Sequence, residues 1–156
     1  MAPIQLNACY RLLLRIARLV LVAVFVTAAL PKIQAPDDFS LAIMNYRVSG
    51  PVLSAWVALF LPWVELVAGL GLLFLPLKRA SGLILSILLL IFIIMHIQAW
   101  MRGLEISCGC FGNDPAELAT STSYLWLISR NALLLIACSL ILFQDIRNQS
   151  KISVAL

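Results

Sequence analysis

Two cysteines separated by one glycine are the residues of this chain whose spacing most directly indicates chemistry. Cys108 and Cys110 can close a disulfide only with strain, and a strained disulfide is reduced more readily than a relaxed one. Gly109 and Gly112 relieve the backbone crowding of so small a ring and let a partner approach. The pair is therefore better suited to thiol–disulfide exchange than to stapling a fold.

Two other interpretations of the cysteine pair stay open. With His96, or with Met95 or Met101, its two thiolates could hold a soft metal ion such as copper(I) or zinc. The two cysteines could also be small loop residues with no pairing, and the chain would then be a non-catalytic membrane scaffold for a partner enzyme. Cys9 and Cys138 stand alone in the sequence and predict no second pair.

Polar residues inside or beside apolar stretches form the second group of candidates. Glu65 and Arg130 each cost about 2.5 to 3.5 kcal/mol in hydrocarbon unless they face the interior of a bundle. We therefore expect Glu65 to pair with Arg130 or Lys32. Either cation could stabilise a thiolate, or the pair could be purely structural. Asn131 follows Arg130, and His96 could move protons or bind a metal, although a lone helical histidine is more often a packing residue.

The elements that must position these residues are set by a composition that requires lipid as the solvent. Apolar residues make up 63% of the 156 positions and charged residues only 12%, unlike a water-soluble domain. Four spans of about 20 residues already use half of this length, so we expect one domain over residues 1–156. The net charge of +4 comes from lysines and arginines scattered in ones and twos, which indicates helix-end anchors and no nucleic-acid partner.

Four apolar stretches predict helices that cross the bilayer. They cover residues 12–30, 52–75, 83–101 and 124–143. The first ends at Pro31 and Lys32, and its alternative is a cleaved signal peptide, although no clear cleavage site follows. The second contains Pro62, which should bend it, and Pro76–Arg79 predicts a tight basic turn before the third.

A short helix is predicted between the first two spans. Residues 37–48 begin with Asp37 and Asp38 and carry Arg47 near their end, a charge order that suits the helix dipole. Apolar residues recur in this segment at three-to-four spacing, as in an amphipathic helix that lies at the membrane interface. The predicted fold class is therefore all-α, an integral membrane four-helix bundle with one short interfacial helix.

The distribution of cations predicts the orientation in a bacterial inner membrane. Seven lysines and arginines lie on the side of the termini and of the second turn, against four on the other side. The seven are Arg11, Arg15, Arg18, Lys78, Arg79, Arg147 and Lys151, and the four are Lys32, Arg47, Arg102 and Arg130. This bias favours cytoplasmic termini and a periplasmic Cys108/Cys110 loop, where disulfides persist.

Several motifs together resemble one known family. They are Ala28–Lys32 followed by Pro36 and Phe39, Asn45-Tyr46, Leu61–Glu65 with Gly69, Arg102-Gly103, Cys108–Gly112, and Trp126 leading to Arg130-Asn131. Over nearly its whole length the chain is similar to the methylamine utilisation protein MauE family, within the wider group of DoxX-like four-helix membrane proteins. The Cys-Gly-Cys-Phe-Gly loop and the Leu-Pro-x-x-Glu helix make this resemblance specific.

The resemblance implies a membrane protein that acts beside a periplasmic thioredoxin-like partner in maturing disulfide-rich proteins, the methylamine dehydrogenase small subunit in the founding case. The chain has one external pair and lacks the second dithiol of DsbB-like or vitamin K epoxide reductase-like oxidases. Electrons could pass to or from a quinone, which Trp100 and Trp126 could flank, although no quinone site is evident. The predicted site is Cys108 and Cys110, supported by Lys32, Glu65, His96, Arg130 and Asn131.

Overall fold

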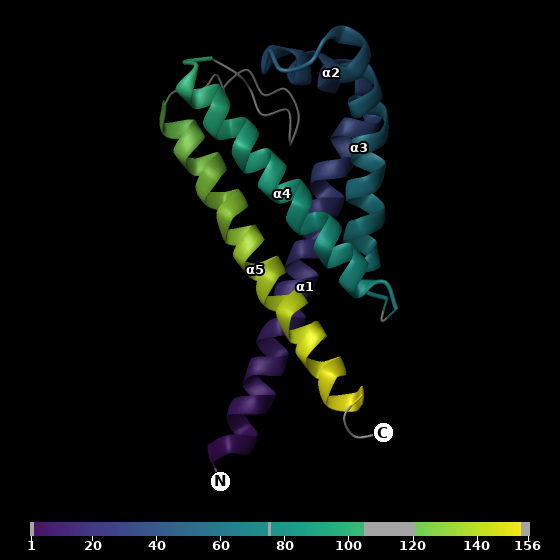
Figure 1. Ribbon diagram of the computed structural model, residues 1–156, viewed down its shortest axis with the longest axis vertical. Coiled ribbons are helices and arrows are strands. Elements are labelled where there is room, and N and C mark those ends of the chain that lie inside the picture. Colours follow the sequence, from purple (N-terminus) through teal and green to yellow (C-terminus); the bar gives the residue numbers. More distant parts are fainter. Residues whose placement is uncertain (1, 75, 105–120, 154–156) are drawn as a thin grey trace.

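The computed structural model describes the backbone of residues 2–74, 76–104 and 121–153, and the side chains of residues 12–74, 76–104, 124–144 and 146. Within these residues the chain forms five α-helices and no strand (Figure 1). The helices are α1 (Ala2–Gln34), α2 (Pro36–Asn45), α3 (Pro51–Gly71), α4 (Lys78–Met101) and α5 (Ser121–Ser153).

Four of these helices carry a stretch long and apolar enough to cross a membrane. The stretches are Leu12–Gln34, Pro51–Gly71, Lys78–Met101 and Tyr124–Gln144. Many large apolar side chains in them point outward, among them Val67 at 67% exposed and Leu133 at 68%. An outer surface this apolar is stable in lipid and not in water. The predicted all-α membrane bundle, with a short helix between its first two spans, is confirmed.

The short helix α2 begins and ends for local reasons. Pro36 occupies the first helical position, where its missing N–H costs nothing, and Asp37 lies in the first turn near the positive end of the helix dipole. The helical pattern was expected to reach residue 48, but the helix ends at Asn45. Arg47 adopts a left-handed backbone with φ 52°, a conformation that cannot continue an α-helix.

Several helix ends differ from the apolar stretches that predicted them. α1 and α5 extend beyond the predicted ranges at both ends, and α3 ends at Gly71 and not at residue 75. α1 continues past Pro31 to Gln34. Proline removes an N–H donor and crowds the preceding turn, but its carbonyl still accepts from the N–H of Ala35 at 3.0 Å, so the helix can continue beyond it. α4 begins at Lys78, so Lys78 and Arg79 belong to the first helical turn of α4 and not to the connecting turn that was predicted over Pro76–Arg79. Long cationic side chains can extend from a helix end toward the headgroups, so the helix need not stop where the apolar residues do.

The spanning helices pack through small residues and a shared apolar core. α4 and α5 lie side by side along most of their length, α3 packs against α1, and α2 lies on α3 (Figure 1). The main core includes Leu21, Phe25, Leu72 and Leu89. Gly69 permits the close contact of α3 with α1, since a Cβ there would lie 3.1 Å from the Phe25 Cβ.

The two ends of the bundle have different contents. The start of α1 and the end of α5 both lie at the lower end in Figure 1, and α2 lies at the opposite end together with the end of α4 and the start of α5. We refer to the latter as the α2 end. Lys32 near the end of α1, His96 near the end of α4, and Arg130 and Asn131 in the first part of α5 therefore lie toward the α2 end of the bundle.

Candidate functional site

A buried ion pair joins the last turn of α1 to the middle of α3. The Lys32 ammonium lies 2.7 and 3.0 Å from the two carboxylate oxygens of Glu65, and the two residues are 3% and 1% exposed. The Phe39 and Phe92 ring centroids lie 5.2 and 5.3 Å from the ammonium, so two aromatic faces add cation–π attraction. Of the two partners expected for Glu65, the structure joins it to Lys32.

The Leu-Pro-Trp-Val-Glu motif places Glu65 in the interior by helical periodicity. Pro62 and Glu65 are three residues apart, so they share one face of α3, and both are buried. Trp63 and Val64 between them face outward and are 51% and 43% exposed. The ionisable residue of this apolar helix is therefore directed at the bundle, as the cost of a carboxylate in lipid requires.

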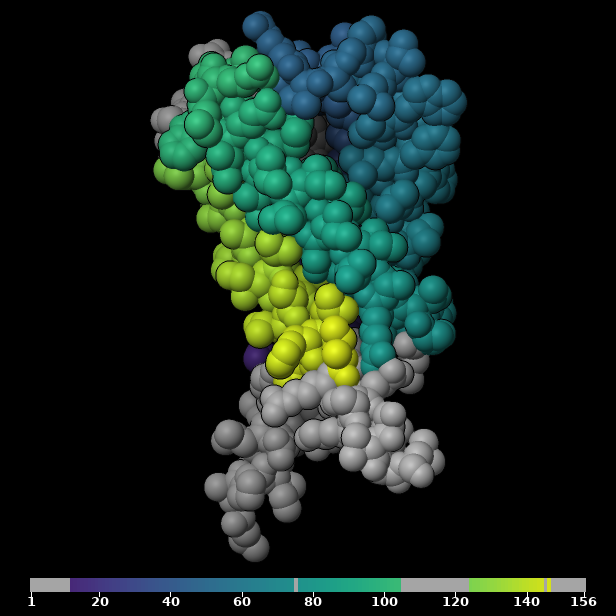
Figure 2. Space-filling view, in the orientation of Figure 1, coloured from purple at the N-terminus to yellow at the C-terminus, as the bar shows by residue number. Residues whose placement is uncertain are grey.

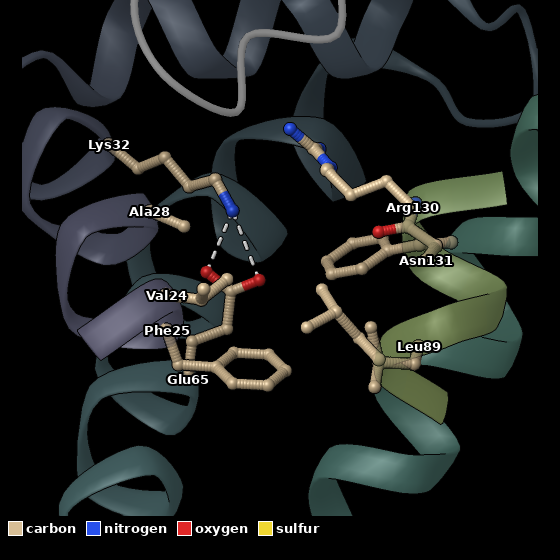
Figure 3. Close-up of a pocket in the computed structure, with 10 residues that line it drawn as sticks. Val24, Phe25, Ala28, Lys32, Glu65, Leu89, Arg130 and Asn131 are labelled. Carbon is tan, nitrogen blue, oxygen red and sulfur yellow. Dashed lines mark hydrogen bonds and ion pairs between the residues drawn. The ribbon is translucent and has the colours of Figure 1, made fainter. Parts of the chain in front are cut away.

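A small cavity of about 30 Å³ borders the ion pair. Its polar lining comes from Lys32, Glu65, Arg130 and Asn131, and the rest is apolar (Figure 3). Arg130 extends from α5 toward the space above the ion pair, and Asn131 is 5% exposed. A polar cavity of this volume suits a single water molecule. Four of the five supporting residues predicted from the sequence are thus brought to one place.

His96 lies in a second, larger cavity and is held by the helix that carries it. Its side chain is 2% exposed, and its Nδ1 lies 2.5 Å from the carbonyl oxygen of Phe92, one turn earlier in α4. Tyr46 packs edge-on against the imidazole, with ring centroids 6.0 Å apart. Phe92 and Lys32 line both cavities, which connects His96 to the ion pair through shared walls.

The sequence reasoning gave no role to the aromatic residues of this site. Phe92 precedes His96 by four residues and so shares its helix face, a spacing that could have identified it. Phe39 comes from α2, and only the tertiary structure brings its ring to Lys32. Trp100 and Trp126, considered as flanks of a quinone, are 45% and 66% exposed on the outer surface.

Comparison with known proteins identifies the family. A model of the family described as methylamine utilisation protein MauE matches residues 10–144. The chain belongs to the MauE family. The resemblance inferred from the motifs is therefore confirmed, and the matched region contains both the ion pair and the Cys-Gly-Cys sequence.

Several curated proteins of this family are similar to the chain. The methylamine utilization protein MauE of Paracoccus denitrificans is 34% identical over 124 residues, which are 79% of this chain and 64% of that protein. The protein of the same name from Methylorubrum extorquens is 34% identical over 121 residues, which are 77% and 63% of the two chains. The matches thus span less than two thirds of these relatives' length. No solved structure matches the chain.

In this MauE-family chain, an aromatic cluster holds Leu104, which precedes Cys108 by four residues in the sequence. The Tyr124 hydroxyl donates to the carbonyl of Leu104, and both residues pack with Tyr46 and Ala99. Burial, and secondarily the neighbouring Tyr124, raises the pKa of Tyr46 from its ordinary value of 10.0 to about 12, so its phenol stays neutral at physiological pH. Arg102 donates to the carbonyl of Arg47 at 3.3 Å, which links α4 to the segment after α2.

The two predicted catalytic residues, Cys108 and Cys110, lie outside the described residues. Their pairing, and the alternative metal site that combines them with His96, remain predictions. Cys138 is buried in α5, where its thiol donates to the Gly82 carbonyl at 3.3 Å and accepts from the Ser86 hydroxyl at 3.4 Å. These contacts give Cys138 a packing role between α4 and α5.

Proposed function

We propose that this MauE-family membrane protein carries out thiol–disulfide exchange with Cys108 and Cys110 on the periplasmic face of the bacterial inner membrane. Its partner in this proposal is a thioredoxin-like periplasmic protein, and its role is the maturation of disulfide-containing periplasmic proteins. The names of its relatives point to methylamine utilisation as the process served. Since the matches cover only part of those relatives, the shared process belongs to the proposal.

One observation carries the proposal: two thiols, one residue apart, follow directly after an anchored helix end. Cys108 stands four residues beyond Leu104 in the sequence, and the Tyr124 hydroxyl binds the Leu104 carbonyl. A reactive pair close to a rigid bundle can meet a soluble partner without unfolding the membrane domain. This arrangement supports exchange more than it supports a structural disulfide, which would tie distant segments together.

The proposed reaction is balanced without a further reagent. A thiolate of one protein attacks a sulfur of the other protein's disulfide and forms a mixed disulfide. The second thiol of the attacking pair then attacks the mixed disulfide, closes a disulfide within its own pair and releases the other protein as a dithiol. One disulfide forms for each that breaks, and two electrons move between the pairs. The proposal holds in either direction of electron flow.

The supporting residues receive positioning roles in this proposal. The Lys32 charge is matched by Glu65, so we assign this pair to fixing α1 against α3 and not to activating a thiol. Arg130 and Asn131 come from α5 and bring polarity to the same small cavity. His96 lines the adjacent larger cavity and packs against Tyr46, which joins the Leu104–Tyr124 cluster.

The test compares single cysteine variants. The readout is the redox state of the partner's cysteines in cells that express both proteins. If the chain oxidises the partner, Cys108→Ser and Cys110→Ser should each lower the partner's oxidised fraction by about tenfold; if it reduces the partner, each should lower the reduced fraction by the same factor. One of the two should accumulate a mixed disulfide with the partner, seen on non-reducing gels. Cys138→Ala is the matched control, because that thiol is buried between helices. Full partner maturation with both loop cysteines replaced would refute the exchange function.

A further inference from the structure

The larger cavity has the size of a single aromatic ring. It encloses about 190 Å³ between the end of α1, α2, α3 and α4. An apolar protein cavity of about 150 Å³ is known to hold benzene, so this one has room for one substituted six-membered ring. Figure 2 shows the surface hollowed between the side chains of α4 and those of α2 and α3, toward the α2 end.

His96 presents an unused hydrogen-bond acceptor in this cavity. Its Nδ1 faces the Phe92 carbonyl, which can only accept, so Nδ1 carries the proton and Nε2 of the neutral ring carries a lone pair. Nε2 is buried and has no hydrogen-bond partner among the residues that the structure describes. A buried acceptor without a donor is unfavourable, so a ligand that brings an O–H would be stabilised there.

Lys32 adds a donor to the same cavity. Its ammonium has three N–H groups, and Glu65 accepts hydrogen bonds from it through both carboxylate oxygens. The remaining N–H can serve a ligand oxygen. A hydroquinone has one oxygen that can donate to His96 and another that can accept from Lys32, whereas a simple phenol would satisfy only the first.

The cavity is open toward the bilayer. Val48, Leu53 and Ile91 are among its lining residues, and their side chains are 52%, 57% and 47% exposed on the outer apolar surface. A ligand can therefore enter from the membrane, and an apolar tail attached to its ring can leave between α3 and α4 into lipid. The occupant must accordingly be soluble in the bilayer.

We propose that this cavity binds the hydroxylated ring of a membrane-soluble hydroquinone, with one hydroxyl donating to His96 Nε2 and the tail lying between Leu53 and Ile91. The proposal concerns binding and assigns no electron transfer. It is independent of the cysteine pair, so it stands or falls separately from the proposed exchange function.

The first experiment measures binding to the full chain in lipid nanodiscs under reducing conditions. Tritiated decylhydroquinone should be retained above the level of empty nanodiscs, with one saturable site per protein. Decylphenol, which lacks the second oxygen, should bind about threefold or more weaker, the size of one lost hydrogen bond. Equal retention by protein-containing and empty nanodiscs would overturn the site, and equal affinity for the two ligands would overturn the Lys32 contact.

The second experiment changes the cavity itself. His96→Phe keeps a ring but removes the acceptor, and should weaken decylhydroquinone binding about 3- to 10-fold. Val57→Phe fills the cavity from its half-buried wall and should abolish saturable binding. Val20→Phe is the matched control, since Val20 is 52% exposed on α1 and lines none of the cavities described above. Unchanged binding in both cavity variants, with helicity retained by circular dichroism, would show that the ligand lies elsewhere.

Discussion

At the scale of single residues, disturbing one member of the buried Lys32–Glu65 pair should be costly. Both charges are removed from lipid and from water, and each is compensated mainly by the other. Burying such a pair is close to neutral overall, whereas leaving one member alone exposes the full desolvation cost. The expected role of the pair is therefore to fix the position of α1 against α3. Two apolar side chains of similar volume could hold the helices in the same position.

Breaking this pair on one side should be strongly destabilising. Glu65→Gln leaves the Lys32 ammonium without its carboxylate, and we expect the free energy of unfolding to fall by about 3 to 5 kcal/mol. The measurement is unfolding in mixed micelles with increasing denaturing detergent, followed by circular dichroism. Asp38→Asn, the same change at an exposed site in α2, should stay within about 0.5 kcal/mol of the parent.

The double variant Lys32→Met with Glu65→Leu decides between a structural and a functional pair. Removing both charges should recover most of the stability lost in Glu65→Gln, because no unpaired charge remains. A double variant that is stable and still matures the partner protein would assign the pair to structure alone. A stable double variant that has lost this activity would give the pair a part in the exchange reaction.

The raised pKa of the Tyr46 phenol predicts that the protein loses stability at high pH. Its pKa is about 12 in the folded protein and 10.0 when unperturbed, so above pH 10 the unfolded chain loses its proton first. The stability that this group contributes is complete below pH 10 and is lost as pH rises toward 12, by up to about 1.4 kcal/mol per pH unit. Unfolding measured between pH 9 and about 12 should show this slope, and Tyr46→Phe should reduce it.

At the scale of elements, sequence periodicity predicted the helices well and their ends poorly. The four spans follow from apolar length, which backbone hydrogen bonding in lipid makes decisive. The ends depend on tertiary and local features that composition does not encode: α1 passes Pro31, and Arg47 stops the segment after α2 with a positive φ. The sequence left both Arg130 and Lys32 as partners for Glu65, and only the contact between α1 and α3 shows that the partner is Lys32.

Gly71, the last residue of α3, lies close to Ser81 of α4, and this contact gives a test of element packing. A Cβ at Gly71 would collide with the Ser81 hydroxyl, so Gly71→Ala should destabilise the protein by about 1 to 3 kcal/mol. Gly50→Ala is the control, because nothing lies within 4 Å of its added Cβ. Thermal unfolding in nanodiscs measures both. Adding Ser81→Ala should restore part of the loss, and no restoration would mean that strain elsewhere in the turn is responsible.

At the scale of the whole molecule, the bundle separates a polar α2 end from an end where α1 starts and α5 ends (Figure 1). The small cavity, the ring-sized cavity and the Leu104–Tyr124 anchor are assembled from helices that are distant in sequence. Lys32, Glu65, His96 and Arg130 could be identified from the sequence, since ionisable groups are rare in apolar helices. The cavities could not, because Phe39, Ile91 and His96 line one cavity only when α2, α3 and α4 are assembled.

The orientation of the molecule is the property on which the exchange function depends most. In a chain with all four cysteines replaced, Asp37→Cys probes the α2 end and Leu77→Cys probes the turn between α3 and α4, where the side chain is 52% exposed. With a cytoplasmic excess of cations at the termini, an impermeant maleimide should label Asp37→Cys in intact spheroplasts and Leu77→Cys only after permeabilisation. The reverse pattern would place the α2 end in the cytosol, where reducing conditions oppose a stable disulfide, and would exclude a periplasmic partner.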